Sequence, residues 1–173
     1  MADDLANLLM VLDSNDTIRG DDVRQWMVNG DLQIRGGVYE IFRRARQRIV
    51  PEIPVDEQHA FILDYLFDCL IQNPAPGDYL HGGFEAAWEI AGWVKYAQAN
   101  GQATEWIKEV VRRLTQAYLS ADDTIRNRIE TGAVEHMFES PLLREHFNFW
   151  KGDPVLGTAY ELCMLWAIEG EAR

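Results

Sequence analysis

Histidine and cysteine, the side chains that most often bind metals or act as catalysts, are sparse in this chain and far apart. The chain has four histidines and two cysteines: His59, His81, His136, His146, Cys69 and Cys163. A helical zinc site typically uses two histidines four residues apart plus a third ligand, and this spacing does not occur. The sequence also contains neither a GxSxG turn for a serine nucleophile nor a glycine-rich phosphate loop. We therefore predict a non-enzymatic protein without catalytic residues, metal site or cofactor.

Glu135 and His136 form the one acid/base pair that would merit a test for enzyme activity. Neighbouring residues on a helix point about 100° apart, so these two side chains do not converge. Gly132, one turn earlier on the same face, leaves a notch through which another helix can approach. We interpret His136 as a residue that fills this contact and hydrogen-bonds a nearby backbone or carboxylate group. The alternative is that the notch lies at a binding surface.

Acidic side chains outnumber basic ones in this chain, 28 to 16. The formal net charge at pH 7 is -12, and residues 55–173 contribute -10 of it, from 19 acidic and nine basic residues. This sign disfavours contact with a nucleic-acid backbone and favours a basic protein partner. The residues expected to contact such a partner are one aromatic anchor and five carboxylates: Trp88, Glu85, Glu89, Glu130, Glu135 and Glu139. The alternative is that these acids are spread over the surface and only keep the protein in solution.

Short amphipathic helices are predicted for the first part of the chain. Residues 3–12 and 21–28 show helical spacing of their apolar side chains, and residues 31–35 are expected as a loop. Residues 37–49 are predicted as a basic helix whose arginines either pair within the molecule or bind phosphate. Its apolar side carries Val38, Ile41, Phe42, Ala45 and Ile49.

Pro51 and Pro54 interrupt helical continuation and mark the expected boundary between two parts. Residues 1–54 are expected as an N-terminal helical segment that packs on a main bundle of residues 55–173. In the main bundle, helical patterns joined by short turns cover residues 56–72, 84–99, 104–119, 121–139, 141–150 and 155–168. Short turns favour antiparallel neighbours. We predict an all-α fold, either an antiparallel helical bundle or a short HEAT-like stack of helix pairs.

Two of these helices carry the candidate partner-binding residues. The helix at residues 84–99 is apolar nearly all round, which predicts a buried central helix. On the helix at residues 121–139, an apolar stripe includes His136, and its other members are Ile125, Ile129, Ala133 and Met137.

The composition predicts a folded protein of a reducing compartment. Cys69 and Cys163 lie among apolar neighbours and are expected to be reduced core residues. Neither a signal peptide nor an apolar run of about 18 residues is present, so no membrane contact is expected and the cytoplasm is the expected location. The six tryptophans are expected in the core, with an exposed aromatic patch as the alternative.

The segment IETGAVEHMFE, preceded by AYLSADDTIRNR, resembles a family of small acidic all-helical bacterial proteins that includes immunity proteins of polymorphic toxin systems. The shared pattern I-x-T-G-x-x-E-H is matched by Ile129, Thr131, Gly132, Glu135 and His136. The resemblance covers about residues 55–168. It implies a cytoplasmic inhibitor that binds a cognate toxin, often a basic nuclease, and occludes its active site. A helical homodimeric scaffold or adaptor is the alternative function.

Overall fold

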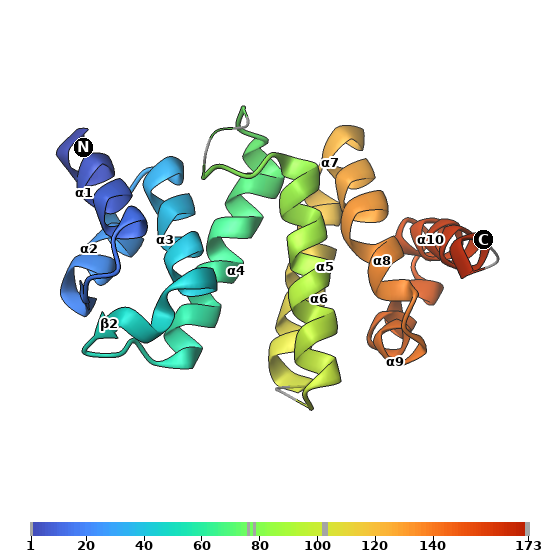
Figure 1. Cartoon of the computed structure of the whole chain (residues 1–173). Coiled ribbons are helices and arrows are strands. Elements are labelled where there is room, and N and C mark those ends of the chain that lie inside the picture. Colours follow the sequence, from blue (N-terminus) through green and yellow to red (C-terminus); the bar gives the residue numbers. More distant parts are fainter. Residues whose placement is uncertain (1, 76, 78, 102–103, 172–173) are drawn as a thin grey trace. The chain divides into compact units, whose positions relative to one another are not determined.

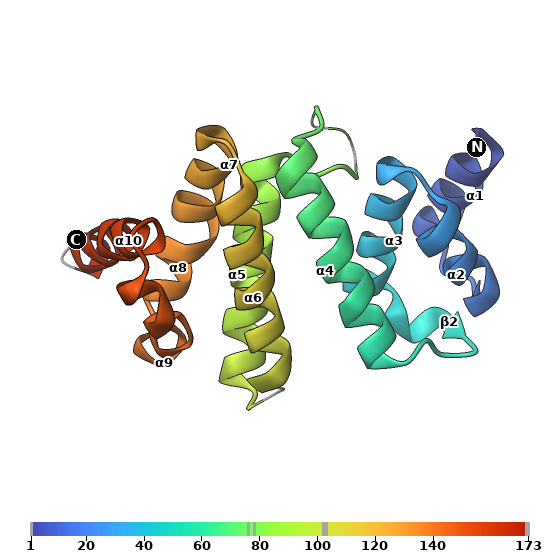
Figure 2. The ribbon, with the colours of Figure 1, turned by 180° about the vertical axis from the view of Figure 1, so that it is seen from behind.

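The computed structural model describes residues 2–75, 77, 79–101 and 104–171 (Figures 1 and 2). The fold is all-α, as predicted, with helices joined by short loops. The two strands β1 (Ile18–Arg19) and β2 (Ile49–Val50) pair in parallel, with Ile18 opposite Ile49. Within the described part of the chain, no helix has both the length and the apolar character needed to span a bilayer.

The chain divides into two compact units, Met1–Gly82 and Gly83–Arg173. The division lies beyond the boundary expected at residue 54, because the helix α4 (Val55–Gln72) packs within the first unit. Phe61 of α4 meets Phe42 edge to face, with ring centroids 5.7 Å apart. The prolines therefore mark a turn inside the first unit.

Besides α4, the first unit contains α1 (Ala2–Asp13), α2 (Gly20–Asn29), α3 (Leu32–Arg44) and the 3₁₀ helix η1 (Arg46–Arg48). The prediction of a loop at residues 31–35 was wrong. Asp31 is the N-cap of α3, and its side chain accepts a hydrogen bond of 3.0 Å from the amide of Ile34. The helix also ends five residues before Ile49, where the predicted helix would have ended, because β2 pairs with β1.

The predicted apolar side of this basic segment is confirmed, since all five of its residues are buried. Three of its arginines bind within the first unit. Arg43 and Arg44 pair with the buried carboxylate of Glu40 at 3.1 Å and 2.5 Å. Arg48 donates to the backbone carbonyl oxygens of Val11 and Asp16, each at 2.8 Å.

The second unit contains six α-helices, a π-helical segment and a 3₁₀ helix among its described residues. They are α5 (Gly83–Ala99), α6 (Thr104–Ser120), α7 (Asp123–Arg128), the π-helical η2 (Ile129–Val134), α8 (Glu135–Phe138), α9 (Pro141–Arg144), the 3₁₀ helix η3 (Glu145–Gly152) and α10 (Leu156–Glu171). Aromatic side chains build the core of this unit. The ring centroids of Phe138 and Phe147 lie 5.2 Å apart, and those of Phe147 and Trp150 lie 5.1 Å apart. Trp150 is fully buried, as the core interpretation of the tryptophans predicts, whereas Trp88 is exposed.

The helix predicted at residues 121–139 runs through α7, η2 and α8 in sequence. A π-helical turn contains one residue more than an α-helical turn, so the residues after η2 rotate relative to a continuous α-helix. Ala133 and Met137 are buried as predicted, and Phe138 is buried as well. His136, which was expected inside the apolar stripe, is instead partly exposed. Its predicted place in the buried stripe was therefore wrong.

Candidate functional site

The backbone of η2 lies close to α5 at Gly132. A Cβ atom added to Gly132 would lie 2.6 Å from the Cβ atom of Ala87 and 3.4 Å from the carbonyl oxygen of Phe84. The predicted notch is thus present, and α5 is the helix that enters it. The indole of Trp88 borders the same contact, with its Cδ1 atom 3.6 Å from that added Cβ position.

A polar network next to this contact connects α5 with α8. The rings of Trp88 and His136 are arranged edge to face, with centroids 6.0 Å apart and planes at 82°. The Nδ1 atom of His136 lies 2.9 Å from Oε1 of Glu139, and the Lys95 ammonium donates to Oε2 of the same carboxylate. The predicted hydrogen bond between His136 and a carboxylate is therefore present. Burial opposes the charged form of Glu139, but the hydrogen bonds from Lys95 and His136 outweigh it and lower the pKa of this carboxyl.

Aromatic and acidic side chains share one exposed side of α5. Trp88 is 59% exposed, and so is Tyr96 two turns later, while Phe84 is 44% exposed one turn before Trp88. Glu85 and Glu89 stand one turn apart on the same exposed arc of α5, about 60° and 100° round the helix from Trp88. We call this surface the acidic aromatic face. Its members are Phe84, Glu85, Trp88, Glu89, Tyr96 and, from the neighbouring segment, Glu139.

This exposure corrects the prediction of a buried central helix at residues 84–99. The buried residues of α5 are mainly small or aliphatic: Gly83, Ala86, Ala87, Ile90, Ala91, Val94 and Ala97. Opposite Gly132, the close approach of η2 leaves room only for a side chain as small as that of Ala87, whereas the rings of Phe84, Trp88 and Tyr96 lie on the outer side.

The other two predicted partner-binding carboxylates point elsewhere. Glu130 accepts a hydrogen bond of 2.5 Å from the hydroxyl of Tyr118 on α6. Glu130 and Glu135 both contribute, after burial, to raising the pKa of the Cys163 thiol on α10. These two acids therefore face α6 and α10, whereas Glu85, Trp88 and Glu89 lie on α5 and Glu139 is paired with Lys95 of the same helix.

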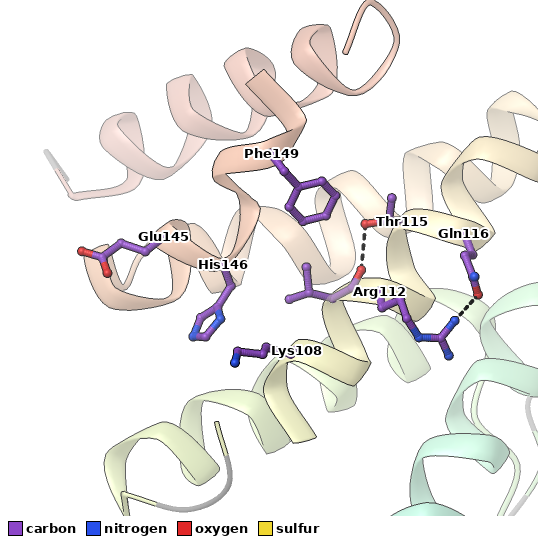
Figure 3. Close-up of a pocket in the computed structure, with 8 residues that line it drawn as sticks. Lys108, Arg112, Thr115, Gln116, Glu145, His146 and Phe149 are labelled. Atoms are coloured by element: carbon purple, nitrogen blue, oxygen red, sulfur yellow. Dashed lines mark hydrogen bonds between the residues drawn. The ribbon is translucent and has the colours of Figure 1, made fainter. Parts of the chain in front are cut away.

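A pocket of about 580 Å³ lies between α6 and η3 (Figure 3). It is lined by Lys108, Val111, Arg112, Thr115, Gln116, Glu145, His146 and Phe149. Behind this lining, the buried Trp150 donates from Nε1 to the hydroxyl of Thr115 at 2.8 Å, and that hydroxyl donates to the carbonyl oxygen of Val111 at 2.8 Å. Sequence reasoning missed this pocket because the helical spacing within α6 does not indicate which later segment covers it.

A buried polar cluster in the first unit surrounds Tyr65. Its hydroxyl lies 2.9 Å from Nδ1 of His81 and 3.0 Å from the carbonyl oxygen of Tyr79, while a Cβ atom added to Gly36 would lie 1.7 Å from that carbonyl oxygen. Burial raises the pKa of the Tyr65 hydroxyl and that of the Cys69 thiol, so both groups are protonated at neutral pH. These contacts hold Tyr79 and His81, which follow α4 in the sequence, against Gly36 of α3 and Tyr65 of α4.

Neither a metal site nor a disulfide is formed within the part of the chain that the structure describes. Among the described residues, no group of three His, Cys, Asp or Glu side chains is arranged to hold a metal ion. Cys69 and Cys163 are buried and are not joined in a disulfide, which confirms their prediction as core residues.

Comparison of the chain with protein-family models, with curated protein sequences and with solved structures finds no match. The resemblance to immunity proteins therefore stays a prediction.

Proposed function

We propose that this protein is a non-enzymatic binding protein that takes a basic protein partner on the acidic aromatic face. The observation that carries the proposal is Trp88, a large ring that is 59% exposed and flanked by Glu85 and Glu89 on the same helix. Exposed tryptophans at the centre of an interface are frequent binding hot spots. Carboxylates around such an anchor attract and orient a partner that carries lysine and arginine.

The packing around Trp88 favours its role as a binding anchor. Trp88 stands on a helix that packs against η2 at Gly132, and its ring forms an edge-to-face pair with the ring of His136. Little side-chain freedom is then lost when a partner covers the ring, which favours affinity. A lysine or arginine of the partner can also bind the face of the indole.

The chemistry of this face suits an immunity-type inhibitor, the function implied by the resemblance at residues 129–136. In this proposal the protein occludes the active site of a cognate basic toxin in the cytoplasm. The formal net charge of -12 speeds the encounter with a basic partner at low ionic strength. Tight inhibition requires an interface of about 1,600 Å² with a few buried anchors, and Trp88 is the first candidate for such an anchor.

The test is a pull-down from the lysate and secretome of the source organism, followed by measurement of the affinity for the purified partner. Trp88→Ala is expected to weaken binding about 30-fold, as for a hot-spot residue. Leu142→Ala is the matched control, because Leu142 is an apolar side chain of the same unit that is 63% exposed and lies outside the face. Equal affinities of Trp88→Ala and the wild type would refute the proposal.

Charge reversal tests the electrostatic part of the proposal separately. Glu85→Lys combined with Glu89→Lys is expected to slow association with the basic partner more at low salt than at high salt. An association rate that is the same for both proteins at low salt would contradict steering by these carboxylates.

A homodimeric scaffold is a second candidate, favoured by α10. Leu165 and Ile168 stand one turn apart on this helix and are 53% and 51% exposed. Apolar residues at this spacing can form one strip for a second copy of the chain. Light scattering at micromolar concentration distinguishes monomer from dimer, and Leu165→Glu is expected to abolish a dimer formed through α10.

A further inference from the structure

We propose that the pocket between α6 and η3 binds a small amphipathic anion, with its charged head on Lys108 and its apolar body on Phe149 and Val111. The site differs from the acidic aromatic face in residues and in chemistry. The proposal does not depend on the function proposed above.

The size and lining of the pocket fit a small ligand. Its volume of about 580 Å³ falls within the usual range for ligand pockets, about 300–1,000 Å³. Figure 3 shows the Phe149 ring above α6, between Lys108 and His146 on one side and Arg112 and Gln116 on the other. The phenyl ring is 57% exposed, whereas Val111, which also lines the pocket, is buried. Apolar surface therefore occupies the middle of the pocket and polar groups lie at its ends.

The charge of the lining indicates an anionic ligand. Lys108 and Arg112 bring two positive charges, against one negative charge from Glu145. Glu105 and Glu109, which pair with these two cations, are not among the lining residues, so two of the charged groups that line the pocket are cationic donors. In Figure 3 the Glu145 carboxylate points away from Lys108 and Arg112, while the rings of His146 and Phe149 point toward α6.

Both cations can bind an anion while keeping their present contacts. The Lys108 ammonium donates to Glu105 at 2.7 Å, and two of its three protons remain for other acceptors. The Arg112 guanidinium is held by Glu109 at 2.5 Å and by the Gln116 amide oxygen at 2.7 Å. These exposed pairs cost little to rearrange. Three of the five N–H groups of Arg112 are used by Glu109 and Gln116, so two donors remain on each cation. Because His146 lies beside Lys108 in Figure 3 and adds a polar ring there, the structure assigns the anionic head to the end of the pocket formed by Lys108 and His146.

The floor of the pocket is fixed before any ligand binds. Trp150 is fully buried and donates to Thr115, and Thr115 in turn donates to the backbone of Val111. A preformed floor spares a ligand the cost of ordering these groups. A medium-chain carboxylate combines the single charge and the apolar length that the lining presents.

The experiment titrates the full chain with octanoate, and with octylamine and octanol as probes of equal length. Nitrogen-15 NMR spectra are expected to show octanoate-dependent shifts in α6 and η3, with weaker effects of octanol and weaker still of octylamine. Lys108→Gln is expected to weaken octanoate binding about threefold to tenfold, through loss of one charge-assisted contact. Lys151→Gln is the matched control, because Lys151 lies on η3 outside the pocket with its ammonium over the Tyr160 ring.

Phe149→Ala tests the apolar half of the site and is expected to weaken octanoate binding by a similar factor, with Leu142→Ala as its control. All four substituted side chains are exposed, and circular dichroism verifies that each variant retains its helices. Absence of octanoate binding at millimolar concentration would overturn the proposal. It would also be overturned if octylamine bound as tightly as octanoate, or if Lys108→Gln and Lys151→Gln weakened binding equally.

Discussion

Replacement of Gly132 by alanine tests the tight contact between η2 and α5. The new Cβ atom would lie 2.6 Å from the Cβ atom of Ala87, whereas carbon atoms in contact prefer about 3.5–4.0 Å. Both atoms are bonded directly to the backbone, so no side-chain rotation can relieve the overlap. The two helices would have to separate by about 1 Å, which disturbs the packing on both sides of the contact.

The expected change in the free energy of unfolding of Gly132→Ala combines two opposing effects. Overpacking of a close contact costs about 1–3 kcal/mol, and the fixed position of both atoms favours the upper half of that range. Alanine recovers up to about 1 kcal/mol through its higher helix propensity. We therefore expect Gly132→Ala to lower the free energy of unfolding by about 1–2 kcal/mol.

Gly92→Ala is the matched control on α5. No atom lies within 4 Å of a Cβ added at Gly92, so only the propensity effect applies. This variant is expected to be more stable than the wild type by about 0.5–1 kcal/mol. Urea denaturation followed by tryptophan fluorescence and circular dichroism gives both values.

A second substitution identifies the partner of Gly132. Ala87→Gly removes the opposing Cβ atom, so in the Gly132→Ala background it should restore part of the lost stability, and a double-mutant cycle measures this coupling. The reasoning is refuted if Gly132→Ala is as stable as the wild type, or if it gains as much stability as Gly92→Ala.

Three further predictions concern stability. Gly36→Ala should destabilise the first unit by at least about 2 kcal/mol in urea denaturation, because its Cβ would lie 1.7 Å from the carbonyl oxygen of Tyr79. Tyr118→Phe should cost about 1–2 kcal/mol in thermal unfolding, because it removes the hydrogen bond of 2.5 Å to Glu130. Burial and the nearby Arg46 lower the pKa of His59 below 6.5, so the unfolded chain takes up this proton first as the pH falls. Stability should therefore decline between about pH 7 and pH 5, and less steeply in His59→Gln, whereas equal slopes would exclude His59 as the cause.

The helices could be predicted from the sequence wherever apolar spacing was sustained, but their ends depended on distant residues. Residues 46–49 were predicted as the end of the basic helix, yet Ile49 pairs with Ile18, which lies far from it in sequence. No pattern within the basic segment indicates that pairing. The N-cap by Asp31 was detectable in principle, because Asp precedes the apolar spacing of α3, but the alternation of residues 31–35 also fitted an extended loop.

The position of His136 could not be predicted by projection onto an α-helix. That projection assumes one constant rotation per residue, and the π-helical η2 breaks the assumption directly before α8 begins at Glu135. Thr131 and Gly132 carry no signal that distinguishes a π-helical turn from an α-helical one. The close approach at Gly132 was nevertheless predictable, since a glycine inside a helix has a packing or binding reason more often than not.

The exposure of Trp88 follows from size rather than from polarity. A sequence analysis by hydrophobicity places every apolar residue of α5 inside, but opposite Gly132 the approach of η2 leaves room only for a side chain as small as that of Ala87. The rings of Phe84, Trp88 and Tyr96 are then displaced to the outer side, whatever their hydrophobicity.

Because Trp88 lies on the outer side of α5, substitutions can test the stability of the fold and the proposed binding separately. Because Trp88 is 59% exposed, its removal gives up little buried area, and Trp88→Ala should leave the free energy of unfolding within about 1 kcal/mol of the wild type. Gly132→Ala reverses this pattern, since it strains the helix contact and leaves the ring in place. A partner that loses affinity with Trp88→Ala, at unchanged stability, would be recognising the ring itself rather than the integrity of the helix that carries it.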